Sequence, residues 1–271
     1  SMTRTWPSIA AGADPRAAAL AGWLRRAAVA GDPAWIVRGS LVTAARCPGA
    51  RAPVDVDYLA PGRGADFDDA ALAARLYTIA AAADPRVADP IALAIDRTEV
   101  IWAESEAPGL RAHAIAQVAG VDVRFGVDVA VGDPMCVAPR PIEVADVGVV
   151  PACAPEMLFG WKLHGLCEFG RGRWRAKDLF DLDLLWRHAG LDPAATRAAI
   201  ALAFASRALP LTALDDFRAR PGWGQSTSGR RKWRGLARQH PAVDDFAATR
   251  DRVRAAVAEV LEGSTPAAGG R

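Results

Sequence analysis

Cysteine and histidine are scarce in this sequence of 271 residues, which has four of each. The cysteines form no CxxC pair and the histidines do not cluster near them, so the spacing typical of a structural zinc site is missing. The same scatter argues against a disulfide framework. We therefore expect a reduced, cytoplasmic protein.

Long apolar runs and a strong excess of one charge are also missing. No apolar stretch reaches membrane-spanning length and no charged-then-apolar signal segment opens the chain, so we expect no membrane partner. The 33 Lys and Arg residues against 31 Asp and Glu residues give a formal net charge of +2. This balance excludes a protein coated in basic charge for bulk nucleic-acid binding, but it leaves room for a local basic patch.

Hydrophobic periodicity divides the chain into a mixed first half and a helical second half. The first half predicts helices at 16–30 and 67–83, and strands at 34–40, 54–60, 91–105, 111–120 and 121–133. The second half predicts helices at 154–170, 177–190, 193–209 and 244–263. We expect a mixed α+β fold: a sheet domain with flanking helices over 1–150, a Pro-rich linker over 137–155, a helical domain over 151–263, and a disordered tail over 264–271.

Two aspartates, Asp55 and Asp57, interrupt the apolar run RAPVDVDYLA. Residues two apart on a strand point to the same face, so these carboxylates project together. Adjacent carboxylates repel each other unless a cation or protons neutralise them. The plain alternative to a metal site is a solvated strand face at a sheet edge.

A third acid lies on the later strand, VDVRFGVDVAVGD. Its alternation puts Asp122 and Asp128 on one face, and alternation alone does not choose between them. Three carboxylates on neighbouring strands predict a site for Mg²⁺, a hard cation that prefers oxygen ligands, with one or two ions and Mn²⁺ as the alternative. Ahead of the acidic pair, RGSLVTAAR places Gly39 and Ser40 between a strand and a helix, where backbone N–H groups can face an anion.

These motifs together resemble a known family. The order RGS, then Arg51, then DVD resembles the nucleotidyltransferase signature hG[GS] followed by [DE]h[DE] on the next strand. The whole pattern is similar to the AbiEii/AbiGii-type toxin nucleotidyltransferases of the DNA polymerase β-like superfamily. In this resemblance the third acid is Asp128, and APEMLFGWKLHGLCEFGRGRWRAKDLFDLDLL matches two helices, with Lys162 in the first and an R-x-K-D-x-x-D start to the second.

The resemblance implies a Mg²⁺-dependent transfer of a nucleoside monophosphate from a nucleoside triphosphate to an acceptor hydroxyl. It implies a toxin of a toxin–antitoxin or phage-defence system, with RNA, above all the 3′ end of tRNA, as acceptor and a cognate antitoxin as partner. A small hydroxylated molecule is the alternative acceptor, and a catalytically silent nucleotide-binding regulator is the alternative function. The implied residues are Asp55, Asp57 and Asp128 for metal and catalysis, Lys162 and Asp178 for catalysis, and Gly39, Ser40, Arg51 and Lys162 for nucleotide binding.

Lys162 and Asp178 also stand out by helical periodicity alone. Each falls on the apolar face of its predicted helix, where a charged side chain requires a partner. We expect the two to interact across antiparallel helices, and the plain alternative is a lysine whose stem covers apolar surface. Asp183, by contrast, we expect to be a solvated surface acid.

Two short clusters, RGRWRAK and GRRKWRG, combine basic residues with a tryptophan. Basic side chains contact phosphates and an aromatic ring can stack on a base, so both clusters predict contact with a polyanionic acceptor. The plain alternative is a solvated charged face. The acceptor-binding candidates are Arg173, Arg175, Lys177, Arg231 and Lys232.

Overall fold

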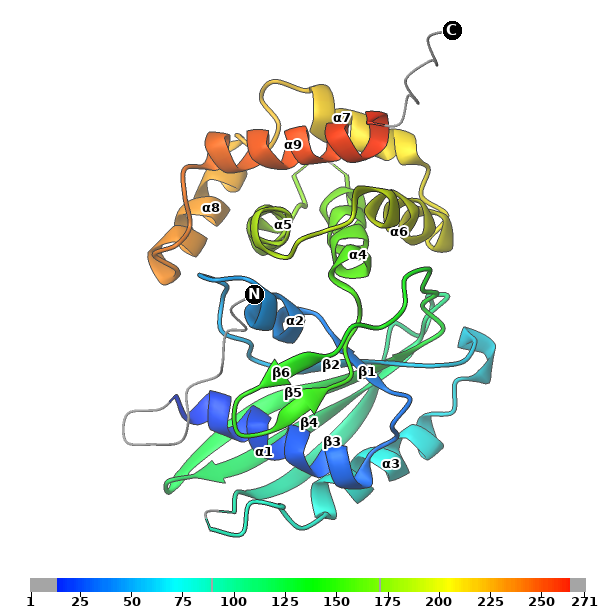
Figure 1. The fold of residues 1–271 in the computed structure, drawn as a ribbon, viewed down its shortest axis with the longest axis vertical. Coiled ribbons are helices and arrows are strands. Elements are labelled where there is room, and N and C mark those ends of the chain that lie inside the picture. The colour runs from blue at the N-terminus through cyan, green and yellow to red at the C-terminus, as the bar shows by residue number, and fades with distance from the viewer. Residues whose placement is uncertain (1–13, 89, 171, 264–271) are drawn as a thin grey trace, which may run out of the picture. The chain divides into compact units, whose positions relative to one another are not determined.

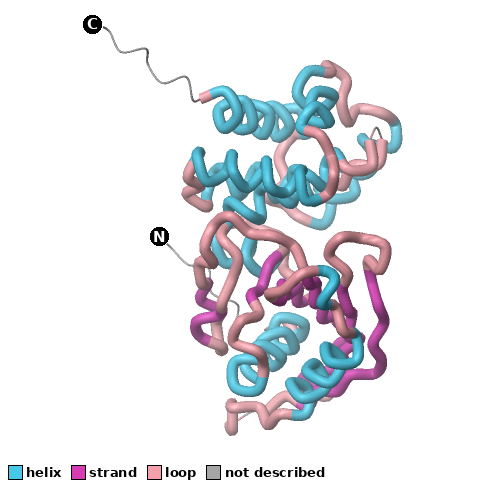
Figure 2. The backbone as a smooth tube through the Cα atoms, turned by 90° about the vertical axis from the view of Figure 1, so that its right-hand side faces the viewer, coloured by secondary structure: helices cyan, strands magenta, loops and turns pink. Residues whose placement is uncertain are grey.

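The computed structural model describes residues 14–263 except 89 and 171. The described chain forms two compact units, one within Ser1–Arg46, Arg51–Asp133 and Ala138–Ala154, the other within Cys47–Ala50, Pro134–Val137 and Pro155–Arg271 (Figure 1). The described strands belong to the first unit, and the second is helical (Figure 2). The expected α+β class is confirmed, whereas the predicted tail lies outside the described residues.

The first unit is built on a five-stranded mixed sheet in the order β1-β2-β5-β4-β3. The β2–β5 pair is parallel, and the β1–β2, β5–β4 and β4–β3 pairs are antiparallel. The strand bounds are β1 Ile36–Arg38, β2 Val56–Ala60, β3 Ala92–Ile101, β4 Gly109–Val118 and β5 Val121–Val131.

One face of this sheet is apolar and is covered by α1 (Pro15–Ala30) and α3 (Asp69–Ala81) (Figure 1). Trp23 of α1 meets Phe125 edge-on at 6.5 Å between ring centroids, and its indole N–H donates to the Tyr58 hydroxyl at 3.2 Å. On β5 the residues facing these helices are buried, from Val123 at 7% exposed to Val127 at 0%. Period-two alternation therefore leaves the polar residues of β2, β4 and β5 on the opposite face.

The segment expected to be a linker is instead part of the first unit. It contains a two-stranded hairpin, β6 (Ile142–Val144) and β7 (Gly148–Val150), and it pairs with β1. Val37 N donates to Pro151 O at 2.9 Å, and Cys153 N donates to Val37 O at 2.9 Å. The linker prediction was wrong because proline lacks only the N–H donor: Pro151 still accepts through its carbonyl, and Cys153 supplies the donor.

The second unit packs α4 (Pro155–Cys167), α5 (Ala176–His188), α6 (Pro193–Ser206), α7 (Asp215–Ala219), α8 (Thr227–Gln239) and α9 (Phe246–Glu262). A Cβ at Gly160 would come within 2.7 Å of the Ala199 carbonyl oxygen, so glycine allows α4 and α6 to pack closely. Within the described residues no single helix is long and apolar enough to span a membrane; one bent pair, α6 with Leu211–Ala219, meets that test by length and composition alone.

A buried ion cluster ties α1 to the loop after α3. Arg25 donates to both carboxylate oxygens of Asp84 at 2.8 Å, and Arg26 lies 3.8 Å from the same carboxylate. The side chain of Asp84 is fully buried. Burial alone would raise the pKa of Asp84, but hydrogen bonds from Arg25 and from the backbone of Ile91 and Arg86 outweigh it and hold the pKa well below its usual range.

We predict that Asp84→Asn lowers the free energy of unfolding by about 3–5 kcal/mol at pH 7, because two buried guanidinium groups lose their counter-charge. A carboxyl whose pKa is depressed by folding stabilises above its unfolded pKa of 3.8 and loses that effect as the pH falls below it. Urea unfolding between pH 7 and pH 3 should therefore show the difference from wild type narrowing at acid pH. If the difference in unfolding free energy between wild type and Asp84→Asn does not change with pH, the ion pair is not the cause of the stabilisation.

Candidate active site

The polar face of the sheet brings Asp57 and Asp128 side by side. Their Cα atoms are register partners in the parallel β2–β5 pair, whose strands lie about 4.8 Å apart. Asp122 lies at the other end of β5, about 20 Å away along the strand, where its carboxylate accepts from Gln117 Nε2 at 2.9 Å. The register thus places Asp128, and not Asp122, beside Asp57, while the role of Asp128 as the third acid stays a prediction.

Asp55 precedes β2 and is anchored to the middle of β5. Its Oδ1 accepts from the backbone N–H of Gly126 at 2.6 Å. A Cβ at position 126 would approach the same oxygen to 3.1 Å, tighter than an ordinary contact. The missing side chain at Gly126 therefore lets the Asp55 carboxylate lie close against the β5 backbone.

Gly39 lies against the second acid of the pair. It has φ +73°, and a Cβ there would lie 2.5 Å from Asp57 Oδ2. Glycine is thus required both by the backbone conformation and by the closeness of the carboxylate. Ser40 begins the short helix α2 (Ser40–Arg46), and Ser40 and Arg51 are both half-buried in the first unit. The nucleotide-binding roles of Gly39, Ser40 and Arg51 stay predictions.

Arg111 of β4 belongs to this site, although sequence reasoning missed it. It is the register partner of Asp128, and its Nε and Nη2 donate to Asp128 Oδ1 and Oδ2, each at 2.7 Å. The hydrogen bonds to Asp128 are the main cause that raises the pKa of Arg111; burial opposes them, and the charges of Asp128, Asp55 and Asp57 add to them. The alternation of Arg111, His113 and Gln117 with alanines indicates a strand with one polar face. It does not show that Arg111 lies beside Asp128, because that depends on the register between β4 and β5.

A second ion pair lies at the edge of the same face. Arg38, next to Gly39, donates to Asp133 Oδ2 at 2.5 Å, and the Asp133 side chain is 2% exposed. Asp133 follows β5 and was also missed from the sequence. This pair fixes the end of β1, and with it the turn that carries Gly39, to the segment that follows β5.

The donor chemistry of this face suits a hard cation. Three carboxylates supply oxygen donors, and the guanidinium of Arg111 already binds there as a positive charge. In the described part of the chain no three or more His, Cys, Asp or Glu side chains form a ready cluster of metal ligands. Asp128 and Asp55 are engaged by Arg111 and Gly126, so an ion would bind by replacing protein hydrogen bonds.

Lys162 is held in a buried ion cluster of the helical unit. Its ammonium lies 2.8 Å from Asp181 and 3.6 Å from Asp178, and the Lys162 side chain is 12% exposed. Asp178 also accepts from Arg175 Nε at 2.7 Å. The expected interaction of Lys162 with Asp178 is present, and Asp181 is the closer partner. The catalytic roles of Lys162 and Asp178 stay predictions.

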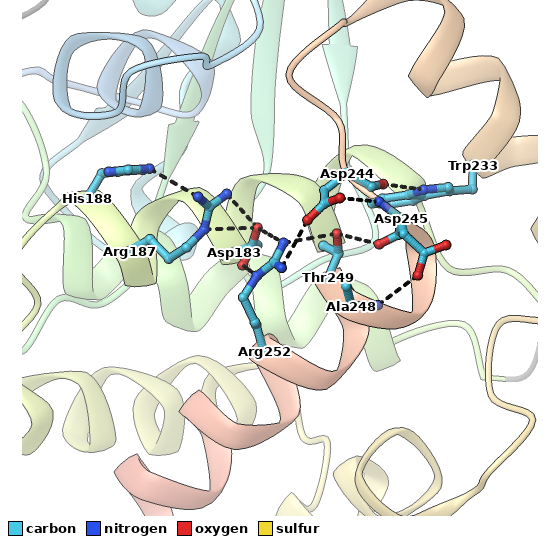
Figure 3. A network of polar contacts seen from close by, with 9 residues as sticks. All are labelled: Asp183, Arg187, His188, Trp233, Asp244, Asp245, Ala248, Thr249 and Arg252. Atoms are coloured by element: carbon cyan, nitrogen blue, oxygen red, sulfur yellow. Dashed lines mark hydrogen bonds and ion pairs between the residues drawn. The ribbon is translucent and has the colours of Figure 1, made fainter.

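Asp183 was wrongly expected to be a solvated surface acid. It is 1% exposed, and Arg187 and Arg252 converge on its carboxylate with N–O distances of 2.8–3.2 Å (Figure 3). Arg252 also donates to Asp244 at 3.1 Å. The network therefore fastens α9 and the loop before it to α5, and it is structural.

The two basic clusters that lie apart in the sequence meet in the helical unit. Lys232 donates to Gly172 O at 2.8 Å and to Trp174 O at 3.1 Å. Trp174 and Trp233 are 3% and 6% exposed and pack around Phe246, so neither ring is available to stack on a base. The stacking expectation was therefore wrong. Of the acceptor-binding candidates, Arg173, Arg175, Lys177 and Arg231 are exposed. Among the described residues, nothing partners the guanidinium groups of Arg173 and Arg231.

Helix α8 carries a one-sided arginine stripe, which we define as Arg230, Arg231, Arg234 and Arg238. At 3.6 residues per turn they lie within an arc of about 100° and span about 12 Å along the helix. All four are exposed, α8 contains no acidic residue, and none of the four guanidinium groups has a partner among the described residues. Ser226 caps the helix by accepting from Gly229 N at 3.1 Å.

Comparisons with known proteins agree with this architecture. The family model described as "Nucleotidyl transferase AbiEii toxin, Type IV TA system" matches residues 23–259. JHP933 from Helicobacter pylori has a similar structure, with a TM-score of 0.56 and 14% identity over 92% of this chain and 91% of that one. A search among curated proteins found no match.

Two further solved structures are more distant. A proposed nucleotidyltransferase from H. pylori gives a TM-score of 0.49 and 12% identity over 90% of this chain and 92% of that one. An antigenic nucleotidyltransferase-like protein from Paracoccidioides brasiliensis gives 0.39 and 11% identity over 88% and 93%. The fold similarity therefore rests on JHP933.

We predict that Gly39→Ala lowers the free energy of unfolding by about 2–3 kcal/mol, since it combines backbone strain with displacement of the Asp57 carboxylate. Gly120→Ala is the matched control, because Gly120 has φ +79° but a Cβ there would meet no atom within 4 Å. It should cost only the backbone strain, about 1 kcal/mol. If thermal or urea unfolding shows the same loss of stability in Gly39→Ala and Gly120→Ala, the contact of Gly39 with Asp57 is not tight.

Proposed function

Because the chain belongs to the AbiEii family of nucleotidyltransferase toxins, we propose that it moves a nucleoside monophosphate from a nucleoside triphosphate to a hydroxyl group of RNA. It is a nucleotidyltransferase by family. The preferred acceptor in this proposal is the 3′ end of tRNA, the product is the extended RNA, and pyrophosphate leaves. We also propose that the protein acts as a toxin with a cognate antitoxin.

The observation that carries the transfer chemistry is the convergence of Asp55, Asp57 and Asp128 on one sheet face. These carboxylates would hold Mg²⁺, which when bound neutralises triphosphate charge and favours in-line displacement. The Gly126 N–H orients Asp55, and the turn at Gly39 positions Asp57. Asp128 is the residue we assign to accept the proton of the attacking hydroxyl.

The remaining assignments concern the triphosphate. Gly39 and Ser40 offer backbone N–H groups after a tight turn, and Arg51 offers a cation. In the helical unit, Lys162 is the residue that we assign to offset the negative charge of the phosphates. Its two aspartates hold the ammonium in one position, which favours a defined contact over a freely moving side chain.

The arginine stripe of α8 supports a polyanionic acceptor over a small one. Four unpaired guanidinium groups on one helix face are repulsive in isolation, and a phosphate backbone would relieve that repulsion. A small hydroxylated acceptor has no use for a charged stripe about 12 Å long. We therefore favour RNA and assign the stripe, together with Arg173, to backbone phosphates.

The transfer should be seen directly with Mg²⁺, total tRNA and each of the four α-labelled nucleoside triphosphates in turn. We expect one nucleotide to label the RNA, and Asp128→Asn to slow labelling at least about a hundredfold, because it removes the proton acceptor and a metal ligand. Asp122→Asn is the matched control on the same strand and should label like wild type. Nucleotide binding without labelling of RNA would favour a small acceptor or a regulator.

The acceptor surface can be tested without turnover. We predict that Arg230→Gln/Arg234→Gln/Arg238→Gln weakens binding of labelled tRNA in fluorescence anisotropy and lowers the slope of log affinity against log salt by about two to three. Replacing Arg63, Arg75 and Arg97, which pair with acids in the first unit, removes the same charge as a control. An unchanged slope in the α8 variant would exclude the stripe from RNA binding.

A further inference from the structure

Both oxygens of Asp128 are engaged by one side chain. The Arg111 guanidinium meets the carboxylate in a parallel two-pronged geometry, with both N–O distances at 2.7 Å. This is the strongest arrangement available to an arginine and a carboxylate. The Asp128 side chain is 5% exposed and that of Arg111 is 37% exposed, so the carboxylate is fixed while the guanidinium has a solvent-facing side.

The surroundings direct Arg111 towards the acids. On its other flank its register partner is Glu99 of β3, but Glu99 is taken by His113 at 2.8 Å and by Arg97 at 2.9 Å. On the acid side a Cβ at Gly126 would lie 3.6 Å from Arg111 Nε, so the side chain passes over the glycine that anchors Asp55. Arg111 thus places a positive charge on Asp128 and within electrostatic reach of Asp55 and Asp57.

We infer that Arg111 is a positioning residue that acts as the resident counter-cation of the site, holding Asp128 and competing with the divalent ion for it. This rests on the proposed function, in which Asp128 is a metal ligand. For Asp128 to hold a divalent ion, Arg111 would have to release at least one of its two oxygens. The phosphates of an incoming nucleoside triphosphate offer the displaced guanidinium the same two-pronged partner. Arg111 therefore links metal loading to nucleotide binding, so that each favours the other.

The experiment is a titration with Mn²⁺, read as free Mn²⁺ by electron paramagnetic resonance, so no turnover is involved. Without nucleotide, Arg111→Gln should bind Mn²⁺ about tenfold more tightly than wild type, because the guanidinium that occupies both oxygens of Asp128 is removed. Arg111→Lys keeps the charge but loses the paired geometry, so its affinity for Mn²⁺ should lie between those of wild type and Arg111→Gln. Arg97→Gln removes the same charge from a neighbouring strand of the sheet and should match wild type.

Adding a non-hydrolysable nucleoside triphosphate tests the linkage. The nucleotide should tighten Mn²⁺ binding to wild type more than to Arg111→Gln. In a double-mutant cycle, Arg111→Gln should not tighten Mn²⁺ binding in an Asp128→Asn background, because the carboxylate for which the arginine and the ion compete has been removed. Thermal unfolding identifies any variant that is not folded, and in that case Arg111→Lys carries the comparison.

The outcomes separate this inference from the proposed function. Equal Mn²⁺ affinity in wild type and Arg111→Gln, with binding lost in Asp57→Asn, would overturn the competition and leave the metal assignment standing. No Mn²⁺ binding to either protein, with or without nucleotide, would overturn both. A gain in Arg111→Gln that persists in the Asp128→Asn background would show that the arginine acts through general charge rather than through Asp128.

Discussion

The polar face of the sheet depends on a single electrostatic constraint: three carboxylates lie close together, Asp57 and Asp128 on adjoining strands and Asp55 directly before β2. Asp57 and Asp128 are register partners, and Asp55 is fixed to the same stretch of β5. Groups of this kind remain ionised together only if positive charge or hydrogen-bond donors surround them. The fold supplies a guanidinium at Asp128 and a backbone N–H at Asp55, and glycines provide the room.

The apolar face of the same strands keeps the acids in place. Val56 and Tyr58 flank Asp57 and are 0% and 5% exposed, and Val127 and Val129 flank Asp128 with no exposure. A slip of one residue in either strand would bury a carboxylate against α1, at a cost of several kcal/mol. The packing of Trp23 on Phe125 and its hydrogen bond to Tyr58 thus stabilise the register that brings the acids together.

Local periodicity made some of this site predictable. The shared face of Asp55 and Asp57, and the two candidates on β5, follow from a repeat of two residues. Alternation alone does not choose between Asp128 and Asp122, and only the resemblance to the family selected Asp128. That Asp128 lies beside Asp57 and pairs with Arg111 depends on strand register, which is non-local. Asp183 was misjudged because one of its partners, Arg252, lies 69 residues away. Trp174 and Trp233 looked like stacking platforms because their core neighbour Phe246 belongs to another helix.

Charge neutralisation by the protein itself is the common theme of both units. Arg111 serves Asp128, and Asp181 and Asp178 hold Lys162, whereas the α8 stripe is left without acids among the described residues. Pairing holds charged side chains in position, and a bound polyanion would relieve the repulsion among the unpaired guanidinium groups. Because the charges of the sheet face are paired and those of the α8 stripe are not, we propose different roles for them: transfer chemistry at the sheet face and acceptor binding at the stripe.

The central claim, that the acids act through a metal ion at the transferred phosphate, is tested most directly with nucleoside triphosphates carrying sulfur at one non-bridging α-oxygen. Mg²⁺ binds sulfur poorly, whereas softer ions accept it. Our account predicts that one diastereomer reacts slowly with Mg²⁺, measured as pyrophosphate release, and recovers with Mn²⁺ or Cd²⁺. Equal rates for both diastereomers with every ion would contradict it.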